Sequence, residues 1–276
     1  MTVPTITLND GNSIPQLGYG VFLVEPDETE RIVSDALEAG YRHIDTAAAY
    51  QNEEGVGRAI AKSGIPRDEL WVTTKLWNDD QGTQSAFDAI DRSLEKLGLE
   101  QVDLYLIHWP SPHRGKYVET WQALEQIKAA GKTRSIGVSN FQPHHLQELF
   151  DASETIPAIN QIELHPKLAQ QEARAFAAKH GIAIESWGPL GQGKYPLFEM
   201  PEVTSAAEAH GVTPAQVIIR WHIQNDLIVF PKTNSPERAR QNFDVFGFEL
   251  TADEMAAIDA LDDGTRVGPD PDTATF

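Results

Sequence analysis

Residues 40–50 read GYRHIDTAAAY, and this stretch decides how the rest of the chain is interpreted. Its first half predicts a short buried strand over residues 41–44, which delivers Asp45 at its end and Tyr50 one loop later. A carboxylate and a phenol held together at the end of a strand are a starting point for proton transfer. A purely structural interpretation competes with this one, because Asp45 and Thr46 could cap the next helix and Tyr50 could be an ordinary half-buried aromatic residue.

The same pattern of apolar strand, loop and amphipathic helix repeats along the chain. Eight strands are expected, each followed by at least one helix, and such alternation predicts a parallel sheet because parallel strands need crossover helices. Eight repeats in 276 residues favour a (β/α)8 TIM barrel, and Gly18 and Gly20 lack the third glycine of an open dinucleotide-binding fold. The expected strands are residues 17–19, 41–44, 71–74, 102–107, 135–138, 158–162, 182–185 and 227–230.

Both ends of the chain add elements to the barrel. Alternation over residues 5–9, a turn at Asp10 and Gly11, and a return over residues 13–15 predict an N-terminal β-hairpin. No linker or low-complexity tract interrupts residues 1–276, so a single domain is expected. The expected helices are residues 28–39, 53–62, 84–97, 118–130, 143–150 and 170–180, with extra C-terminal helices at 203–210, 214–224, 236–243 and 252–260.

The composition narrows the possible functions. The chain has 22 basic and 41 acidic residues, and a net charge of −19 opposes binding to nucleic acid or to anionic membranes. The absence of cysteine excludes disulfides, thiol nucleophiles and thiolate-bound metals, and it fits a cytoplasmic setting. No apolar run approaches the roughly 18 residues of a membrane span, and the first residues lack the basic flank and apolar core of a signal peptide.

Polar residues follow each of the last seven predicted strands. The carboxyl ends of barrel strands share one rim, where barrel enzymes carry their chemistry. A lone histidine before Trp-Pro is more often a hydrogen-bonded core residue than a catalyst, but seven polar strand ends in succession indicate a site. These residues are Asp45, Lys75, His108, Ser139 with Asn140, Gln161, Ser186 with Trp187, and Lys232.

Four of these groups suit proton transfer to a carbonyl. The phenol of Tyr50 has an ordinary pKa of about 10, which a Lys75 ammonium beside it would lower. Asp45 would keep Lys75 charged and aimed, and a neutral His108 would donate a hydrogen bond to the carbonyl oxygen. The set contains no nucleophile, so it fits hydride addition from a cofactor.

The chain resembles the aldo-keto reductases, most closely the bacterial branch that contains the 2,5-diketo-D-gluconate reductases. The resemblance rests on GYRHIDTAAAY, TTKLW, LIHWP, GVSNF, NQIELHP, SWGPLGQG and VFPKTNSPERARQNF, which occur in the family's order and span nearly the whole chain. It implies a (β/α)8 barrel that reduces aldehydes and ketones with NADPH and without a metal. It also implies a catalytic tetrad of Asp45, Tyr50, Lys75 and His108, with Tyr50 as the general acid.

The resemblance implies where the nicotinamide end of the cofactor binds. Ser139, Asn140 and Gln161 would hold the carboxamide, and Trp187 would stack on the ring. The glycine-rich loop that follows would cross the pyrophosphate, although with Pro189 it is also consistent with a flexible turn. Its binding residues would be Gly188, Leu190, Gly191 and Gln192.

The segment VFPKTNSPERARQNF implies the site of the adenosine 2′-phosphate. Lys232, Arg238 and Arg240 gather there in an otherwise acidic chain, and a helix starting at Pro236 adds N-terminal amides that favour an anion. We therefore expect NADPH in preference to NADH, although residues 234–235 are uncharged where the diketogluconate reductases are more basic. By resemblance, Lys232, Thr233 and Arg238 hold the phosphate, and Gln241 and Asn242 lie near the adenine.

The expected substrate side is apolar. The chain after Leu261 is brief, which leaves little to fold over the pocket, so we expect a fairly open site for small aldehydes, α-ketoesters, methylglyoxal or keto-sugar acids such as 2,5-diketo-D-gluconate. Trp77 and Trp109 could instead be core residues. The substrate-facing residues by resemblance are Phe22, Ala49, Trp77, His108 and Trp109, with the tail around residues 266–271.

Other classes of function stay open. A non-catalytic NADPH-binding redox sensor would share the cofactor site, but the complete tetrad opposes it. A sugar isomerase or metal-dependent hydrolase would need clustered metal ligands, and the chain has no HxH or HExxH; His144 and His145 are expected to be solvated at a helix start. A serine hydrolase is disfavoured because GVSNF lacks the last glycine of GxSxG. We expect a monomer that acts on a small carbonyl compound.

Overall fold

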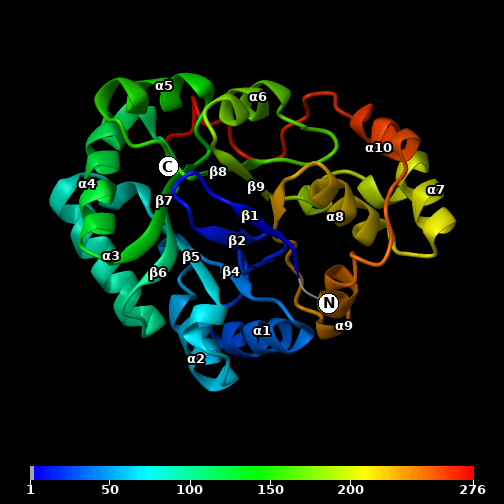
Figure 1. The fold of residues 1–276 in the computed structure, drawn as a ribbon, viewed down its shortest axis with the longest axis horizontal. Helices are drawn as coiled ribbons and strands as arrows, with labels where there is room; N and C mark the ends of the chain where they lie inside the picture. The colour runs from blue at the N-terminus through cyan, green and yellow to red at the C-terminus, as the bar shows by residue number, and fades with distance from the viewer. Residues whose placement is uncertain (1–2) are drawn as a thin grey trace.

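A computed structural model describes residues 3–276, in which eight parallel strands form a barrel inside a layer of helices (Figure 1). Each strand pairs with the next one in the chain, and the ring closes where Leu17 pairs with Val229. The predicted (β/α)8 barrel is confirmed. The strands are β3 (Tyr19–Gly20), β4 (His43–Asp45), β5 (Trp71–Leu76), β6 (Val102–Ile107), β7 (Thr133–Ser139), β8 (Ile159–Glu163), β9 (Ala183–Trp187) and β10 (Ile228–Val229).

The helices bury one face each, either against the barrel or against a neighbouring helix. In α1, Ile32, Val33, Ala36 and Leu37 are buried, and Gly40 ends the helix in the left-handed conformation with φ 113°. The first and last residues of every helix lie within two residues of those predicted. Among residues 3–276, none of these helices is long and apolar enough to cross a membrane. They are α1 (Pro26–Ala39), α2 (Glu53–Ser63), α3 (Thr83–Leu97), α4 (Tyr117–Ala129), α5 (Pro143–Ala152), α6 (Gln171–Lys179), α7 (Pro201–His210), α8 (Pro214–Gln224), α9 (Pro236–Phe243) and α10 (Ala252–Asp259).

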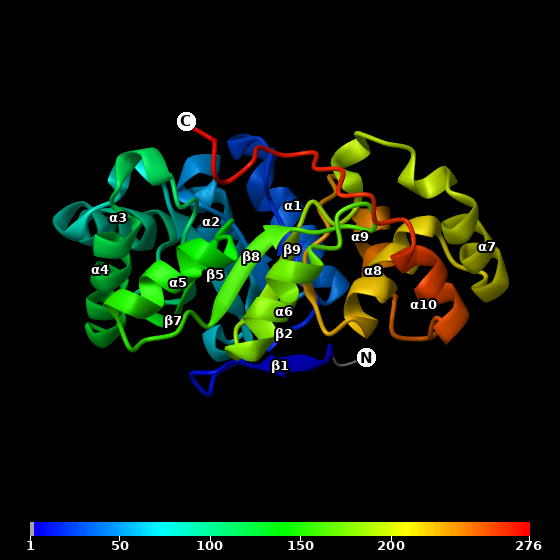
Figure 2. The same cartoon turned by 90° about the horizontal axis from the view of Figure 1, so that it is seen from above.

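The predicted hairpin closes the amino-terminal end of the barrel. β1 (Thr5–Thr7) pairs antiparallel with β2 (Ser13–Pro15), and Ile14 is fully buried in an apolar cluster that includes Trp71 and Leu104 of the barrel strands. Figure 2 shows this hairpin on the side of the barrel opposite the C-terminal segment. The polar ends of the strands therefore face one open rim.

The segment after α10 returns across that rim, drawn in red in Figure 2. Val267, Gly268, Pro269 and Phe276 from this segment line the cavity at the rim. The tail around residues 266–271, expected to face the substrate, thus lines the cavity through residues 267–269, and with Phe276 the tail covers more of the rim than expected. The reason is geometric: α10 ends beside the barrel, and the short extended tail that follows is long enough to cross its mouth.

Candidate active site

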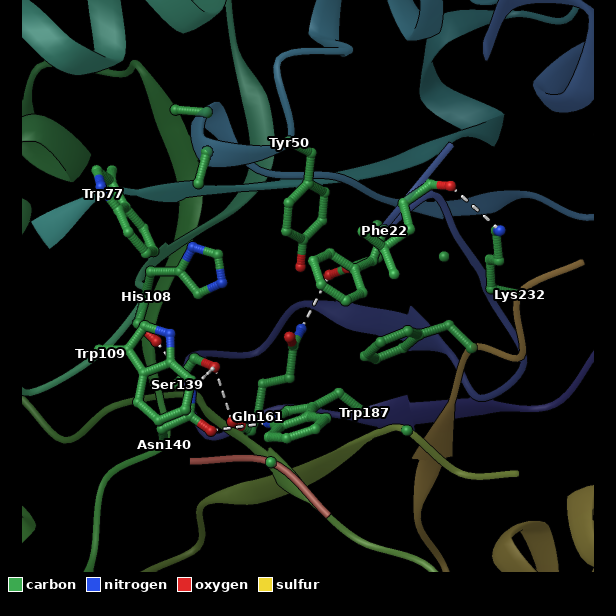
Figure 3. A pocket seen from close by; sticks show the side chains of 18 of the residues that line it. Phe22, Tyr50, Trp77, His108, Trp109, Ser139, Asn140, Gln161, Trp187 and Lys232 are labelled. Atoms are coloured by element: carbon green, nitrogen blue, oxygen red, sulfur yellow. Dashed lines mark hydrogen bonds between the residues drawn. The ribbon is translucent and has the colours of Figure 1, made fainter. Parts of the chain in front are cut away.

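A cavity of about 1120 Å³ lies at the carboxyl ends of the strands (Figure 3). The sequence predicted an active site at this rim, and most of the residues expected to bind cofactor or substrate line the cavity. Lys75 is fully buried beneath the wall, in contact with two of the lining residues. The expected residues in the wall are Phe22, Asp45, Ala49, Tyr50, Trp77, His108, Trp109, Ser139, Asn140, Gln161, Trp187, Gly188, Leu190, Gln192 and Lys232.

The Lys75 ammonium is held by three acceptors. Its Nζ donates to Asp45 Oδ1 at 2.7 Å, to the backbone oxygen of Thr46 at 2.8 Å and to Tyr50 Oη at 3.3 Å. An ammonium has three N–H groups, so each of them has a partner. β4 supplies Asp45, β5 supplies Lys75, and the single turn over residues 48–50 brings the phenol back to the ammonium. Asp45 thus acts on Lys75 and does not cap α2.

Burial and charge set the protonation of these groups. Burial raises the pKa of Tyr50, and the neighbouring Lys75 lowers it by a smaller amount. Lys75 therefore acts in the expected direction, but the net pKa of Tyr50 is raised, which is opposite to the sequence expectation. Burial alone would lower the pKa of Lys75, but Asp45 and Tyr50 outweigh it and raise it. Burial holds the pKa of His108 well below 6.5. At neutral pH the site therefore presents a protonated phenol, a fixed ammonium and a neutral imidazole.

A chain of hydrogen bonds orders the opposite wall. Trp187 Nε1 donates to Asn140 Oδ1 at 2.7 Å, and Asn140 Nδ2 donates to the backbone oxygen of His108 at 2.9 Å. Ser139 Oγ donates to the backbone oxygen of Gln161 at 2.8 Å. Asn140 itself adopts φ 65°, a left-handed conformation that asparagine tolerates better than most residues. These side chains are thus fixed next to the tetrad.

Gln161 joins this wall to the tetrad and to a residue that the sequence interpretation missed. Its Nε2 donates to Asp45 Oδ2 and to Glu185 Oε2, each at 2.9 Å, which leaves Oε1 as an acceptor for a ligand amide. Glu185 is fully buried, and its burial, with Asp45 nearby, raises its pKa to about 8. The available signal was an acidic residue inside a predicted buried strand, since such a residue is costly unless it is neutral or paired.

We predict that Glu185→Gln stabilises the protein by an amount that grows as pH rises from about 5 to about 8. In that range the unfolded chain ionises the glutamate near its ordinary value of about 4.3 while the folded chain keeps the proton, so rising pH favours unfolding of the wild type only. Urea unfolding of both proteins across pH 5–9 measures this. A stability difference that does not change with pH would contradict it.

The residues expected at the adenosine end surround the start of α9. Lys232 lines the cavity and its Nζ donates to the backbone oxygen of Leu23 at 3.3 Å, so it crosses to the opposite wall. Ser235 caps α9 by accepting from the backbone N–H of Arg238 at 3.3 Å. The other expected residues lie outside the cavity wall, with Arg238 and Gln241 exposed and Gly191, Thr233 and Asn242 buried.

Aromatic side chains form the substrate wall, and one of them was not anticipated. Phe276 stacks on Trp77 at a centroid distance of 5.9 Å and meets the edge of Trp109 at 5.1 Å. Phe22 packs on Tyr50 at 5.1 Å. No sequence pattern pointed to Phe276, because its position depends on the path of the whole tail. Trp77 and Trp109 face the cavity and are more than core residues.

His144 and His145 differ from expectation, because His145 is buried. Asp272 of the tail has its Oδ1 at 3.2 Å from His144 Nε2 and at 3.4 Å from His145 Nε2, so these three groups could hold a metal ion. His145 Nδ1, however, accepts the backbone N–H of Gln142 at 3.1 Å, which places the ring proton on Nε2 and leaves no lone pair there for a metal. The group fits a hydrogen-bonded contact of the tail better than a metal site.

The arrangement matches a known family over most of the chain. A family model described as the aldo/keto reductase family matches residues 16–263. The chain belongs to the aldo/keto reductase family. That family uses NADP(H), so the protein is an oxidoreductase, and the resemblance found in its motifs is confirmed.

Relatives of this aldo-keto reductase match it over nearly its full length. An aldo-keto reductase of Mycolicibacterium smegmatis is 56% identical over 273 residues, which are 99% of this chain and 98% of the relative. The methylglyoxal reductase DkgA of Escherichia coli K12 is 49% identical over 273 residues, 99% of this chain and 98% of the relative. A crystal structure of a Gox0644 variant in complex with NADPH has a TM-score of 0.96 at 48% identity and covers all of both chains.

Proposed function

We propose that this aldo-keto reductase uses NADPH to reduce small aldehydes and ketones to alcohols, with Tyr50 as the proton donor. The observation that carries the proposal is the buried Lys75 ammonium, bonded at once to Asp45 and Tyr50 beside a neutral His108. A single barrel domain over residues 1–276 would hold the whole site.

Each of the four tetrad residues has a separate role in the reduction of the carbonyl group. A carbonyl oxygen placed between Tyr50 and His108 accepts hydrogen bonds from both, which polarises the C=O bond. NADPH, when bound, supplies the hydride. As negative charge grows on oxygen, Tyr50 gives up its proton, and the Lys75 ammonium stabilises the phenolate that forms. Asp45 keeps Lys75 charged and prevents it from turning away.

The opposite wall fits the cofactor. Gln161 Oε1 can accept the N–H of a carboxamide, and Ser139 and Asn140 flank it. Trp187 offers a ring face for stacking, and the loop with Gly188, Leu190 and Gln192 supplies backbone along the path of the pyrophosphate. Lys232, Thr233 and Arg238 would hold the 2′-phosphate at the capped start of α9, with Gln241 and Asn242 beside the adenine.

The substrate wall favours small, partly apolar carbonyl compounds. Phe22, Trp77, Trp109 and Phe276 narrow the cavity beside Tyr50, so a bulky ketone would have to displace the tail. Two relatives are named methylglyoxal reductase DkgA, which supports α-dicarbonyls as a substrate class. Keto-sugar acids such as 2,5-diketo-D-gluconate are the more polar candidates.

The proposal is tested by following NADPH consumption at 340 nm with methylglyoxal, an α-ketoester, an aromatic aldehyde and 2,5-diketo-D-gluconate. Turnover with at least one of them is expected, and the ranking defines the substrate class. If NADPH quenches tryptophan fluorescence but none of the carbonyls is reduced, the redox sensor becomes the better interpretation. If NADPH neither binds nor reacts, the proposed site is wrong.

We predict that Arg238→Ala weakens NADPH binding much more than NADH binding. Only NADPH carries the 2′-phosphate, and hydrogen bonds to charged groups contribute about 1.5–3 kcal/mol, or roughly a 10- to 150-fold change in affinity. Fluorescence titration of both cofactors measures the two losses. Arg58→Ala, which removes an exposed arginine of α2 outside the cavity wall, is the matched control. Equal losses for NADPH and NADH would contradict the assignment of Arg238.

A further inference from the structure

Glu163, at the end of β8, holds the C-terminal tail against the barrel. It is fully buried, its Oε1 accepts the backbone N–H of Val267 at 2.6 Å, and its Oε2 accepts the N–H of Gly268 at 3.0 Å. Arg266 Nη1 lies 3.6 Å from the same carboxylate. Burial alone would raise the pKa of Glu163, but hydrogen bonds from His165 and from these two amides lower it below its ordinary value. The group is thus an ionised acceptor.

The same carboxylate is connected to the loop at the cofactor end of the cavity. His165, also fully buried, has its Nε2 3.0 Å from Glu163 Oε1 and its Nδ1 2.8 Å from Tyr195 Oη. An ionised carboxylate can only accept, so the imidazole proton lies on Nε2 and Nδ1 accepts the Tyr195 O–H. Tyr195 therefore donates to His165, and His165 donates to Glu163.

Tyr195 belongs structurally to the glycine-rich loop. Its ring lies so close to Gly191 that a Cβ atom there would come within 2.7 Å of it, and Gly191 has φ 69°. Lys167 lies on the same side, with its Nζ 5.7 Å from the Tyr195 ring centroid and 2.6 Å from Asp263 at the start of the tail. Displacing Tyr195 would therefore move the loop proposed to cross the pyrophosphate.

The tail also packs against Trp187, the residue proposed to stack on the nicotinamide. At Gly268 an added Cβ atom would lie 2.3 Å from the Trp187 ring and 3.0 Å from Glu163 Oε2. Glycine is thus required for the tail to fit between the carboxylate and the indole. Neither Glu163 nor His165 nor Tyr195 lines the cavity, so none of them is placed to touch a ligand.

We propose that Glu163, His165 and Tyr195 form a positioning network through which the glycine-rich loop and the C-terminal tail hold each other in place. The proposal rests on the proposed function for the identity of the ligands: the loop covers the cofactor and the tail covers the carbonyl substrate. A ligand that orders one segment then favours the closed position of the other, and this coupling is reciprocal for the two affinities.

Tyr195→Phe tests the network because it removes one hydroxyl that bonds to His165 and not to the tail. Hydrogen exchange followed by mass spectrometry compares peptides that cover the tail and the glycine-rich loop. We expect the tail peptides that contain Val267 and Gly268 to exchange about fivefold faster in Tyr195→Phe, a fold-change at the low end of typical couplings between sites. Tail exchange at the wild-type rate would overturn the proposal.

Glu163→Gln should have a larger effect, since an amide replaces one of the two acceptor oxygens. The matched control is Glu254→Gln, which alters another His–Glu contact, with His210 at 2.9 Å between α7 and α10. It should leave exchange in the loop and in the tail unchanged. If the control speeds tail exchange as much as Glu163→Gln does, the network has no special role. Should Glu163→Gln fail to fold, Tyr195→Phe alone decides.

Ligand measurements separate this inference from the proposed function. NADPH added to the wild type should slow exchange in the tail, and Tyr195→Phe should lose most of that protection while the KM for the carbonyl rises and kcat changes little. NADPH protection of the tail that is equal in both proteins would overturn the coupling. If NADPH does not bind the wild type, the proposed function fails, and the exchange rates without ligand still test the network.

Discussion

Replacing Tyr50 with phenylalanine should lower turnover by about 10²–10⁴-fold, the usual contribution of a positioned acid. The variant keeps the ring that packs on Phe22 and His108 and removes only the hydroxyl bonded to Lys75. No other phenol in the cavity wall can replace it, since Tyr50 is the one tyrosine among the lining residues of the described chain. Steady-state NADPH consumption with the best carbonyl of the panel measures the loss.

NADPH affinity serves as the internal control for this variant. The hydroxyl faces the carbonyl side, so cofactor titration by tryptophan fluorescence should give a Kd close to the wild-type value. Tyr117→Phe, which removes a hydroxyl bonded to Glu148 outside the cavity wall, controls for the loss of a phenol away from the tetrad and the proposed cofactor site. Near-normal turnover in Tyr50→Phe with normal cofactor binding would refute the role of Tyr50 as proton donor.

Lys75→Met should abolish reduction and also destabilise the fold. Removing one partner of a buried ion pair leaves an uncompensated charge and costs about 3–5 kcal/mol, here because the Asp45 carboxylate loses its strongest donor. The ammonium also lowers the pKa of Tyr50, so its loss raises that pKa. Reduction needs the protonated phenol, and any remaining activity should therefore extend to higher pH. Turnover across pH 6–10 and urea unfolding measure the two effects.

The double variant Asp45→Asn with Lys75→Met separates stability from chemistry. Asparagine removes the unpaired charge, so most of the lost stability should return, whereas activity should not. Recovery of activity together with stability would mean that Lys75 acts only on the fold. An unchanged pH profile in a folded and active Lys75→Met protein would show that Lys75 does not tune Tyr50.

The sequence was sufficient for the barrel and for most of the wall of the cavity, for a physical reason. Alternating strands and helices have one parallel closed arrangement at this length, and closure brings all carboxyl ends of the strands to one rim. Asp45, Lys75, His108 and Gln161 could thus be placed together without knowledge of any side-chain contact. Tyr50 followed because only one turn separates it from β4.

The residues that escaped prediction depend on contacts between distant segments. Glu185 ends one predicted strand and Glu163 directly follows another, and only the packing shows that Glu163 binds tail amides while Glu185 stays protonated. His145 looked solvated because its partner Asp272 is 127 residues away along the chain. Phe276 had no local signal at all. Sequence periodicity reports which face of an element is buried, and it does not report what a tail will cover.

The hairpin of β1 and β2 offers a place to attach the protein to a surface, at the end of the barrel away from the cavity. Its turn at Gly11 is exposed, and a side chain added there would meet no other atom within 4 Å, although φ 87° favours keeping a glycine. The cavity lies at the other end of the barrel, where the carboxyl ends of the strands line it. A surface anchor introduced at Thr7 or Ser13, the exposed pair that flanks this turn, would orient an immobilised protein with its cavity toward the solution.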